Sequence, residues 1–263
     1  MMLTREQAAF YEETGYLRVP GVFSPAEVRA LSAELDAVIA VWATTNEGWT
    51  GPWRRAYMDG DLERRSKLTH INDFHLHSGA WLRAAAHADL VDLVGGLLGS
   101  HEVELHHSTL HAKPPETGMP FPMHQDSPFY RHEGAAYVDA VVHVDDATRE
   151  NGCLRFLTGS HRRGHLEHIT REPDGTPCSP HLPTDRYRLI DTLECPAQAG
   201  DVVLFSIYTV HGSDINRTGA VRRLVRLGYR DPRCIQTGGF GLDRPGWMVR
   251  GVRPPAGGGA AAA

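Results

Sequence analysis

The pattern His-x-Asp, a histidine and an aspartate separated by one residue, occurs at residues 87–89, 124–126 and 143–145. In a β-strand, residues i and i+2 share one face, so such a pair can present an imidazole and a carboxylate to one metal ion. In a helix, residues two apart point in different directions, which excludes the pair at 87–89 because it falls in an expected helix. One more histidine would complete two imidazoles and one carboxylate, the arrangement typical of non-haem Fe(II) oxygenases.

The second histidine must come from another strand, and His211 is suitably placed. It follows the apolar run 201–208, which is expected to be a strand, and it precedes Gly212-Ser213. The chain has 16 histidines, but most histidines in proteins are surface or structural residues, so abundance alone does not indicate a metal. On spacing alone, either remaining His-x-Asp pair could join His211 at an ion.

The residues after His211 predict an arginine near the ion. Residues 215–219 have the composition of a turn, and a second strand is expected to follow. If the two strands make a hairpin, Arg222 lies directly opposite His211, whereas Arg223 faces away and Arg226 lies roughly 13 Å farther along. A guanidinium at Arg222 can hold a dicarboxylate by a bidentate, charge-assisted pair. The competing interpretation is a plain surface hairpin with an exposed arginine.

The elements that must position these residues change type along the chain. Capping-box sequences at residues 4–7 and 24–27 predict two helices, the second running to about Trp42. The apolar periodicity of residues 82–98 predicts another helix. From residue 102 to about residue 229, short extended runs alternate with Pro, Gly and Asn, which indicates strands. Helices followed by many short strands predict an α+β chain whose strands form a sandwich or a barrel.

Residues 44–58 are rich in Gly, Trp and Arg and show no periodicity. Two interpretations stay open: a surface loop pinned by its tryptophans, or a lid over a substrate. Trp53 lies in this segment and is one candidate for a substrate pocket.

Length and composition limit the class of protein. The 263 residues, 41% hydrophobic and 22% charged, suit one globular domain, expected over residues 1–253, with a disordered Pro/Gly/Ala tail at 254–263. The net charge of −5 offers no basic surface to nucleic acid, and no apolar run is long enough to span a membrane. The four cysteines are widely spaced, which argues against a zinc knuckle or a disulfide framework. We expect a cytoplasmic monomer or homodimer that binds a small molecule.

Several short motifs follow one another in a consistent order. They are Gly15-Tyr16, Lys113-Pro114-Pro115, His124-Gln125-Asp126, Glu150-Asn151-Gly152, Gly159-Ser160-His161, Gly200-Asp201, and His211-Gly212-Ser213 with Arg222. Together they resemble the phytanoyl-CoA dioxygenase family of Fe(II)/2-oxoglutarate-dependent oxygenases, and several ordered motifs are far more specific than one. The resemblance implies a double-stranded β-helix, a cupin-like jelly roll, with the N-terminal helices packed on it.

The resemblance also implies a role for each matching residue. The implied metal ligands are His124, Asp126 and His211. This selects the second His-x-Asp pair over the third. Arg222 with Ser213 resembles the clamp for the distal carboxylate of 2-oxoglutarate. Lys113 and Gln125 match positions where the family often has cosubstrate contacts or pocket residues.

The expected substrate pocket departs from the family at two positions. Met123 stands where many members have a Trp before the metal-binding histidine, and Val141 stands where a Trp is common in a later strand. Val141 and His143 share a strand face, so His143 should point into or beside the cavity, either as a substrate contact or as a buried histidine bonded to the backbone. The shape of the pocket therefore does not transfer from the family.

The implied activity is hydroxylation of an unactivated C–H bond of a small organic molecule. The implied cofactor is Fe(II), with 2-oxoglutarate and O2 as cosubstrates, and secondary metabolism is one setting for such an enzyme. Two alternatives stay open. One is a cupin-like metal-dependent isomerase or hydrolase without 2-oxoglutarate, which would not need Arg222. The other is a non-catalytic small-molecule binding barrel.

Overall fold

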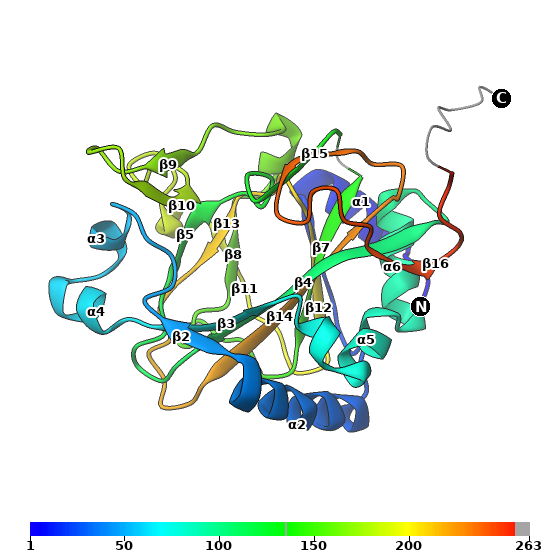
Figure 1. Cartoon of the computed structure of the whole chain (residues 1–263), viewed down its shortest axis with the longest axis horizontal. Helices are drawn as coiled ribbons and strands as arrows, with labels where there is room; N and C mark the ends of the chain where they lie inside the picture. The colour runs from blue at the N-terminus through cyan, green and yellow to red at the C-terminus, as the bar shows by residue number, and fades with distance from the viewer. Residues whose placement is uncertain (135, 256–263) are drawn as a thin grey trace.

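Two β-sheets lie face to face at the centre of the protein, and helices cover the outside of the larger sheet (Figure 1). The computed structural model describes residues 1–134 and 136–255. The strands of the larger sheet are β1 (Tyr16–Val19), β2 (Thr44–Asn46), β3 (Leu68–Asn72), β4 (Val103–Lys113), β7 (Tyr137–His143), β12 (Val202–Ser206), β14 (Arg222–Arg230) and β16 (Trp247–Arg250). Those of the smaller sheet are β5 (Phe121–His124), β8 (Leu154–Phe156), β11 (Leu193–Cys195) and β13 (His211–Ser213). Two further pairs are β6 (Tyr130–His132) with β15 (Gln236–Gly239), and β9 (Ile169–Arg171) with β10 (Pro177–His181).

The order of the strands is that of a jelly roll. Neighbours in the larger sheet follow the order β1-β12-β7-β14-β4-β3-β2, with β16 beside β4. The smaller sheet has the order β11-β8-β13-β5. The pairs in both sheets are antiparallel and join strands from distant parts of the sequence, so the chain passes repeatedly from one sheet to the other. The expected α+β fold with a double-stranded β-helix core is confirmed.

The first two helices begin where their capping boxes predict. The helices are α1 (Arg5–Thr14), α2 (Pro25–Trp42), α3 (Arg54–Tyr57), α4 (Gly60–Arg65), α5 (Gly79–Ala85) and α6 (Ala88–Leu98), with single 3-10 turns at Phe74–His77, Ser160–Arg163 and Leu189–Asp191. At the start of α1, the Gln7 backbone N–H donates to the Thr4 hydroxyl, and the Gln7 side chain accepts from the Thr4 N–H. Ser24 and Glu27 form the same reciprocal pair at the start of α2.

The single helix expected over residues 82–98 is wrong, because the chain forms α5 and α6 with a break between them. The hydroxyl of Tyr229 donates to the carbonyl of Ala85 at 2.8 Å, which satisfies one carbonyl at the end of α5. His87 then adopts an extended conformation, φ −57° and ψ 128°. The alanines at the break favour a helix, so packing overrides local propensity here.

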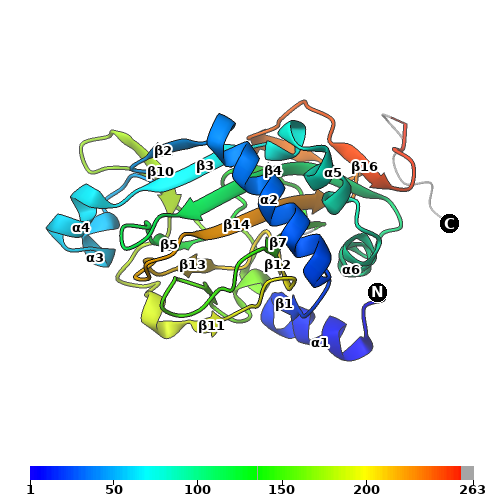
Figure 2. The same ribbon diagram turned by 90° about the horizontal axis from the view of Figure 1, so that it is seen from below.

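Helices α2, α5 and α6 cover the outer face of the larger sheet, and Figure 2 shows α2 crossing its strands. Side chains on the strands alternate between the two faces. In β14, Val225 and Leu227 pack into the core beneath the helices, while Leu224 and Arg226 face the space between the sheets. The larger sheet is thus buried on both faces, and its inner face can carry polar groups for a site.

The hairpin expected after His211 is wrong. Strand β13 pairs with β5 and β8 in the smaller sheet, whereas β14 pairs with β4 and β7 in the larger one. Between the two strands the chain crosses from one sheet to the other. The side chain of Asn216 fixes this crossing by donating to the carbonyls of Lys113, Pro114 and Ala220. Arg222 is therefore the neighbour of Lys113, not of His211.

Residues 44–58 are more regular than expected, since they contain β2, which pairs with β3, and the short helix α3. At the other end of the chain, residues 251–255 have no helix or strand, and residues 256–263 of the expected tail lie outside the described residues. Among the residues that the structure describes, no helix is long and apolar enough to cross a membrane.

Candidate metal centre and active-site cavity

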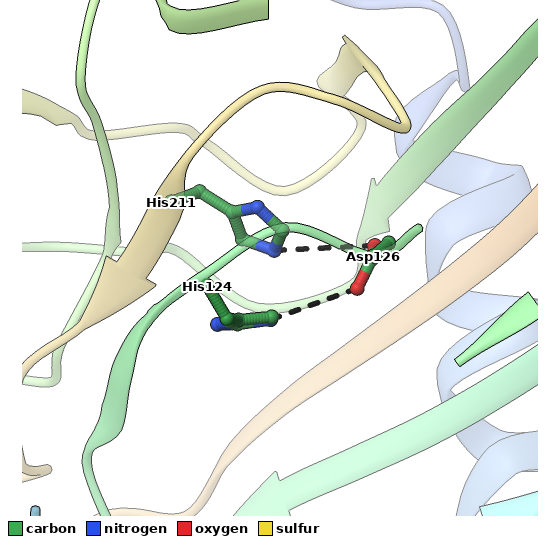
Figure 3. Close-up of side chains that lie close together, drawn as sticks. All are labelled: His124, Asp126 and His211. Carbon is green, nitrogen blue, oxygen red and sulfur yellow. Dashed lines mark ion pairs between the residues drawn. The ribbon is translucent and has the colours of Figure 1, made fainter. Parts of the chain in front are cut away.

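Two histidines and one aspartate converge between the sheets (Figure 3). His124 on β5 and His211 on β13 are direct partners in the antiparallel register, so their imidazoles lie side by side. Asp126 comes two residues after His124. Its carboxylate oxygens lie 3.6 Å from Nε2 of His124 and 4.0 Å from Nε2 of His211. One potential ligand atom from each residue lies within 4.8 Å of the other two, which is close enough to share one ion.

Backbone carbonyls fix the orientation of both imidazoles. Nδ1 of His124 lies 2.7 Å from the carbonyl of Pro122, and Nδ1 of His211 lies 3.0 Å from that of Thr209. A proton on each Nδ1 makes Nε2 the lone-pair nitrogen, and both Nε2 atoms face Asp126. The donor set of two neutral imidazoles and one carboxylate fits Fe(II) and leaves coordination positions open.

Burial and charge put His211 and Asp126 in the protonation states that a metal requires. Burial, with a contribution from the neighbouring His124, lowers the pKa of His211 to about 3, so its imidazole is neutral at ordinary pH. Burial alone would raise the pKa of Asp126, but Arg226 and the two imidazoles hold it well below its usual value. The carboxylate is therefore ionised before any metal arrives.

Arg226 holds the carboxylate of Asp126 in place. Its Nη1 lies 3.1 Å from Oδ2 of Asp126 and 2.8 Å from Oδ1 of Asp139, and it also contacts the hydroxyl of Tyr130. Tyr130 in turn donates to Oδ2 of Asp139 at 2.9 Å. The sequence placed Arg226 too far along its strand to reach the ion, because the assumed hairpin was wrong. In the jelly roll, β14 belongs to the sheet that faces β5 and β13, so Arg226 reaches Asp126 directly.

Replacing Arg226 with Gln is expected to weaken Fe(II) binding roughly 10- to 100-fold, because groups that orient a metal ligand typically contribute that much to metal affinity. The measurement is an anaerobic Fe(II) titration of the wild type and the variant. Arg226→Lys keeps the charge but loses the fork geometry, so its affinity should fall between the two. Equal affinity in all three proteins would show that Arg226 does not position Asp126.

The three ligands open onto a cavity of about 440 Å³ between the two sheets. This volume lies in the range of small-molecule sites. Strands β3, β4 and β14 of the larger sheet supply much of the lining, β5 and β13 of the smaller sheet supply His124 and His211, and Asp126 follows β5. Six of the lining residues are large aromatic ones: Trp49, Phe121, Phe129, Tyr130, Phe205 and Phe240.

Arg222 lines this cavity and is only 2% exposed. Its Nε and Nη2 have no hydrogen-bond partner among the described residues. Burial lowers the pKa of Arg222 to about 10, so the guanidinium is still a cation at neutral pH. A buried cation without a partner is costly, and an anionic ligand would remove that cost. The distal carboxylate of a 2-oxoglutarate molecule has the charge and shape that this guanidinium accepts.

Ser213 also lines the cavity, and Lys113 acts behind it. Nζ of Lys113 donates to the Ser213 hydroxyl at 2.8 Å and to the carbonyl of Asp214. Lys113 is 1% exposed and lies beside Arg222 in the register. The arrangement favours Lys113 as the residue that orients Ser213, and Ser213 as the one that faces a ligand.

Gln125 has a structural role in place of the expected cosubstrate contact. Its Nε2 donates to the carbonyls of Gly164 and Tyr208 at 2.8 and 2.7 Å, and its Oε1 accepts from the N–H of Leu166 at 2.7 Å. Gln125 does not line the cavity, whereas both flanking residues, His124 and Asp126, do. Gln125 thus ties the segment after residue 163 to the metal-binding strand.

Of the four residues expected in the substrate pocket, only Val141 lines the cavity. Trp53 is 1% exposed in an apolar cluster beside α3, and Met123 is 1% exposed in another. His143 is the register partner of Leu224, a lining residue, so it lies beside the cavity without lining it. The pocket expectation is therefore corrected for Trp53 and Met123, which are packed in apolar clusters instead. The position of His143 beside the cavity agrees with the expectation, although its Nε2 has no hydrogen-bond partner among the described residues.

Sequence reasoning missed much of the cavity lining, including Trp49 and His107. Trp49 packs edge-on against His124, with ring centroids 4.7 Å apart, so the tryptophan-rich segment does cover the metal site, but through Trp49 and not Trp53. His107 on β4 lines the cavity as well. The only sequence signal for it was the doubled His106-His107 in an expected strand, which does not say which of the two faces inward.

Comparison with known proteins groups the chain with enzymes that use 2-oxoglutarate. The sequence profile of the family described as phytanoyl-CoA dioxygenase matches residues 11–224. A methylphosphonate hydroxylase from Gimesia maris is 30% identical and aligns over 86% of this chain and 80% of its own length. A probable alpha-ketoglutarate-dependent hypophosphite dioxygenase from Stutzerimonas stutzeri is 27% identical over 85% of this chain and 77% of its own length.

The likeness extends to solved structures. The crystal structure of EctD from S. alaskensis with 2-oxoglutarate and 5-hydroxyectoine is 26% identical and has a TM-score of 0.68. The match covers 96% of this chain and 85% of EctD. Sequence and fold therefore point to the same group of enzymes.

Proposed function

Because the chain belongs to the phytanoyl-CoA dioxygenase family of Fe(II)/2-oxoglutarate-dependent enzymes that act on small molecules, we propose that it hydroxylates an unactivated C–H bond of a small organic substrate. The proposed iron ligands are His124, Asp126 and His211. The observation that carries the proposal is their convergence on one point of a cavity that also contains the unpartnered cation of Arg222.

The cosubstrate is proposed to bind between the iron and Arg222. Arg222 would take its distal carboxylate in a bidentate pair, with the Ser213 hydroxyl, oriented by Lys113, as a second donor. An isomerase or hydrolase without 2-oxoglutarate, or a binding barrel, would leave Arg222 buried without an anion, so neither alternative is favoured.

When bound, Fe(II) with 2-oxoglutarate and O2 supplies the oxidising chemistry. The residues of the chain position the substrate C–H bond and keep water out of the cavity. Trp49 is the residue best placed to keep water out, because it packs against His124 and also against Phe121 and Phe129. The similarity to a methylphosphonate hydroxylase makes methylphosphonate one candidate substrate to be tested.

We also propose that residues 1–253 form one domain, since β1 near the start of the chain and β16 near its end belong to the same sheet. A cytoplasmic location, as a monomer or homodimer without nucleic-acid or membrane partners, is proposed from the sequence. The net charge of −5 and the four free cysteines support it.

The test is formation of succinate from 2-oxoglutarate in the presence of Fe(II), ascorbate and O2, screened over candidate substrates that include methylphosphonate. We expect slow succinate release by the protein alone and faster release with a true substrate, together with a hydroxylated product. Absence of any Fe(II)-dependent succinate release, from a protein that holds iron, would contradict the proposal.

A further inference from the structure

We propose that the substrate is an uncharged, ring-bearing molecule whose hydroxyl or carbonyl groups bond to a row of imidazoles on β3 and β4. This row, called the imidazole row here, consists of His70, His107 and His111, all of which line the cavity. The inference rests on the proposed function, because it names the substrate class of the same site.

His107 is the strongest member of the imidazole row. It is 2% exposed, and neither Nδ1 nor Nε2 has a hydrogen-bond partner among the described residues. The rings of Tyr130 at 4.6 Å, His106 at 5.2 Å and Phe240 at 5.6 Å meet it edge to face and leave both nitrogens unsatisfied. Buried polar atoms in native proteins almost always have partners, so a ligand in the cavity is expected to supply them. A neutral imidazole offers one donor and one acceptor, which matches a hydroxyl or a hydroxyl next to a carbonyl.

A β-bulge aims His107 into the cavity. In the pairing of β4 with β14, Gly228 lies opposite His107 and Tyr229 lies opposite Leu105, so His106 is an extra residue without a partner. Leu105 packs beneath the helices, and in a regular strand His107 would share its face. The bulge moves His107 to the inner face, as bulges beside active sites commonly do.

The residue opposite His107 must be glycine. A Cβ atom on Gly228 would lie 2.1 Å from the hydroxyl oxygen of Tyr137 and 3.3 Å from Cδ2 of His107. The bulge and Gly228 together allow the imidazole of His107 to lie on the inner face of the sheet.

The charges of the cavity argue against an anionic substrate. Arg226 is held by two carboxylates, and its Nη2 lies 3.3 Å from the hydroxyl of Thr109. Arg222 is assigned to the cosubstrate. Among the described lining residues there is no lysine and no other arginine, so a phosphonate would find no free cation. Burial also lowers the pKa of all three histidines of the imidazole row, which keeps them neutral.

The aromatic part of the cavity lining suits an apolar ring. Trp49 and Phe129 pack against each other with ring centroids 4.9 Å apart, and both line the cavity together with Phe240. Aromatic rings prefer to pack against flat apolar groups, whereas the imidazole row needs polar ones. The substrate that satisfies both sides has an apolar ring body with neutral polar substituents.

Binding without turnover tests this proposal. The protein is loaded anaerobically with Mn(II) and 2-oxoglutarate, and the proton relaxation of trans-1,4-cyclohexanediol is compared with that in the Zn(II)-loaded protein. Because Mn(II) is paramagnetic, faster relaxation places the probe near the metal. We expect saturable, Mn(II)-dependent relaxation of the diol and none of methylphosphonate.

The variants make the test specific to His107. His107→Phe should weaken diol binding roughly 10-fold, the effect of losing one or two hydrogen bonds. His107→Gln keeps a donor and an acceptor, so it should bind the diol more tightly than His107→Phe and less tightly than the wild type. The matched control is His101→Phe, since the His101 side chain is 74% exposed just before β4, and this change should have no effect.

These binding measurements either support the proposed substrate class or overturn it. Stronger relaxation of methylphosphonate than of the diol, no diol binding at all, or diol binding unaffected by His107→Phe would overturn the substrate class. In the same samples, Mn(II) and 2-oxoglutarate binding are measured separately. Failure of the protein to bind Mn(II) and 2-oxoglutarate would contradict the proposed function itself. A protein that binds both but does not bind the diol would contradict only the proposed substrate class.

Discussion

Replacing Asp126 with alanine is expected to abolish metal binding and turnover while leaving the fold intact. Asp126 is the only carboxylate that faces Nε2 of His124 and His211 in the described chain. Among the described residues its side chain accepts no hydrogen bond from a backbone N–H, and Arg226 would still be paired with Asp139 in the variant. Loss of a direct ligand should lower Fe(II) affinity by more than about 100-fold, the upper range for groups that act only through a ligand. The measurements are iron content after anaerobic dialysis and succinate formation.

The matched control is Asp145→Ala, which removes the aspartate of the third His-x-Asp pair. Asp145 accepts from Arg223 on the far side of β14, at 2.6 Å from Nη2, so its loss should lower stability but not iron content. Circular dichroism establishes that both variants fold. If Asp126→Ala kept its iron and Asp145→Ala lost it, the assignment of the metal site would be reversed.

The second large effect is expected for Arg222→Ala, which should raise the 2-oxoglutarate concentration needed for half-maximal rate roughly 10- to 100-fold. This range corresponds to the loss of a charge-assisted hydrogen bond in a buried site. Fe(II) binding should be unchanged, because Arg222 does not touch the ligands. The measurement is succinate formation against 2-oxoglutarate concentration, together with a metal titration of the same protein.

Arg223→Ala is the natural control for Arg222→Ala, since the two residues are adjacent but face opposite sides of β14. Arg223 pairs with Asp36 and Asp145 beneath α2, at 2.6 Å from each. Its loss should reduce stability and leave the 2-oxoglutarate requirement as in the wild type. An unchanged requirement in Arg222→Ala, or a raised one in Arg223→Ala, would show that another cation binds the cosubstrate.

The residues that converge as candidate metal ligands could be predicted from the sequence, whereas the path of the chain between them could not. Ordered motifs identified His124, Asp126 and His211, and period-two alternation placed Arg222 on an inward face. The assumed hairpin was nevertheless wrong, because a turn composition at residues 215–219 does not reveal whether the next strand pairs with the previous one or crosses to another sheet. The contact between Arg226 and Asp126 depends on that crossing.

The lining of the cavity was the least predictable part of the protein. Trp53 and Trp49 lie in the same irregular segment, and only packing decides that Trp49 reaches His124 while Trp53 is buried elsewhere. His107 reaches the cavity through a bulge, which breaks the alternation on which sequence reasoning depends. Helix starts were predictable because capping boxes are local, but at the break between α5 and α6 the Ala85 carbonyl accepts from Tyr229, which is distant in the sequence.

The most direct test of the proposed iron and 2-oxoglutarate sites is a crystal structure of the protein from crystals grown anaerobically with Fe(II) and 2-oxoglutarate. We predict one iron, located by anomalous scattering, with Nε2 of His124, Nε2 of His211 and a carboxylate oxygen of Asp126 at roughly 2.0 to 2.2 Å. The distal carboxylate of 2-oxoglutarate should lie against Arg222. Iron bound at any other residues would contradict the proposed metal site. A distal carboxylate of 2-oxoglutarate on Arg226 would contradict the proposed role of Arg222.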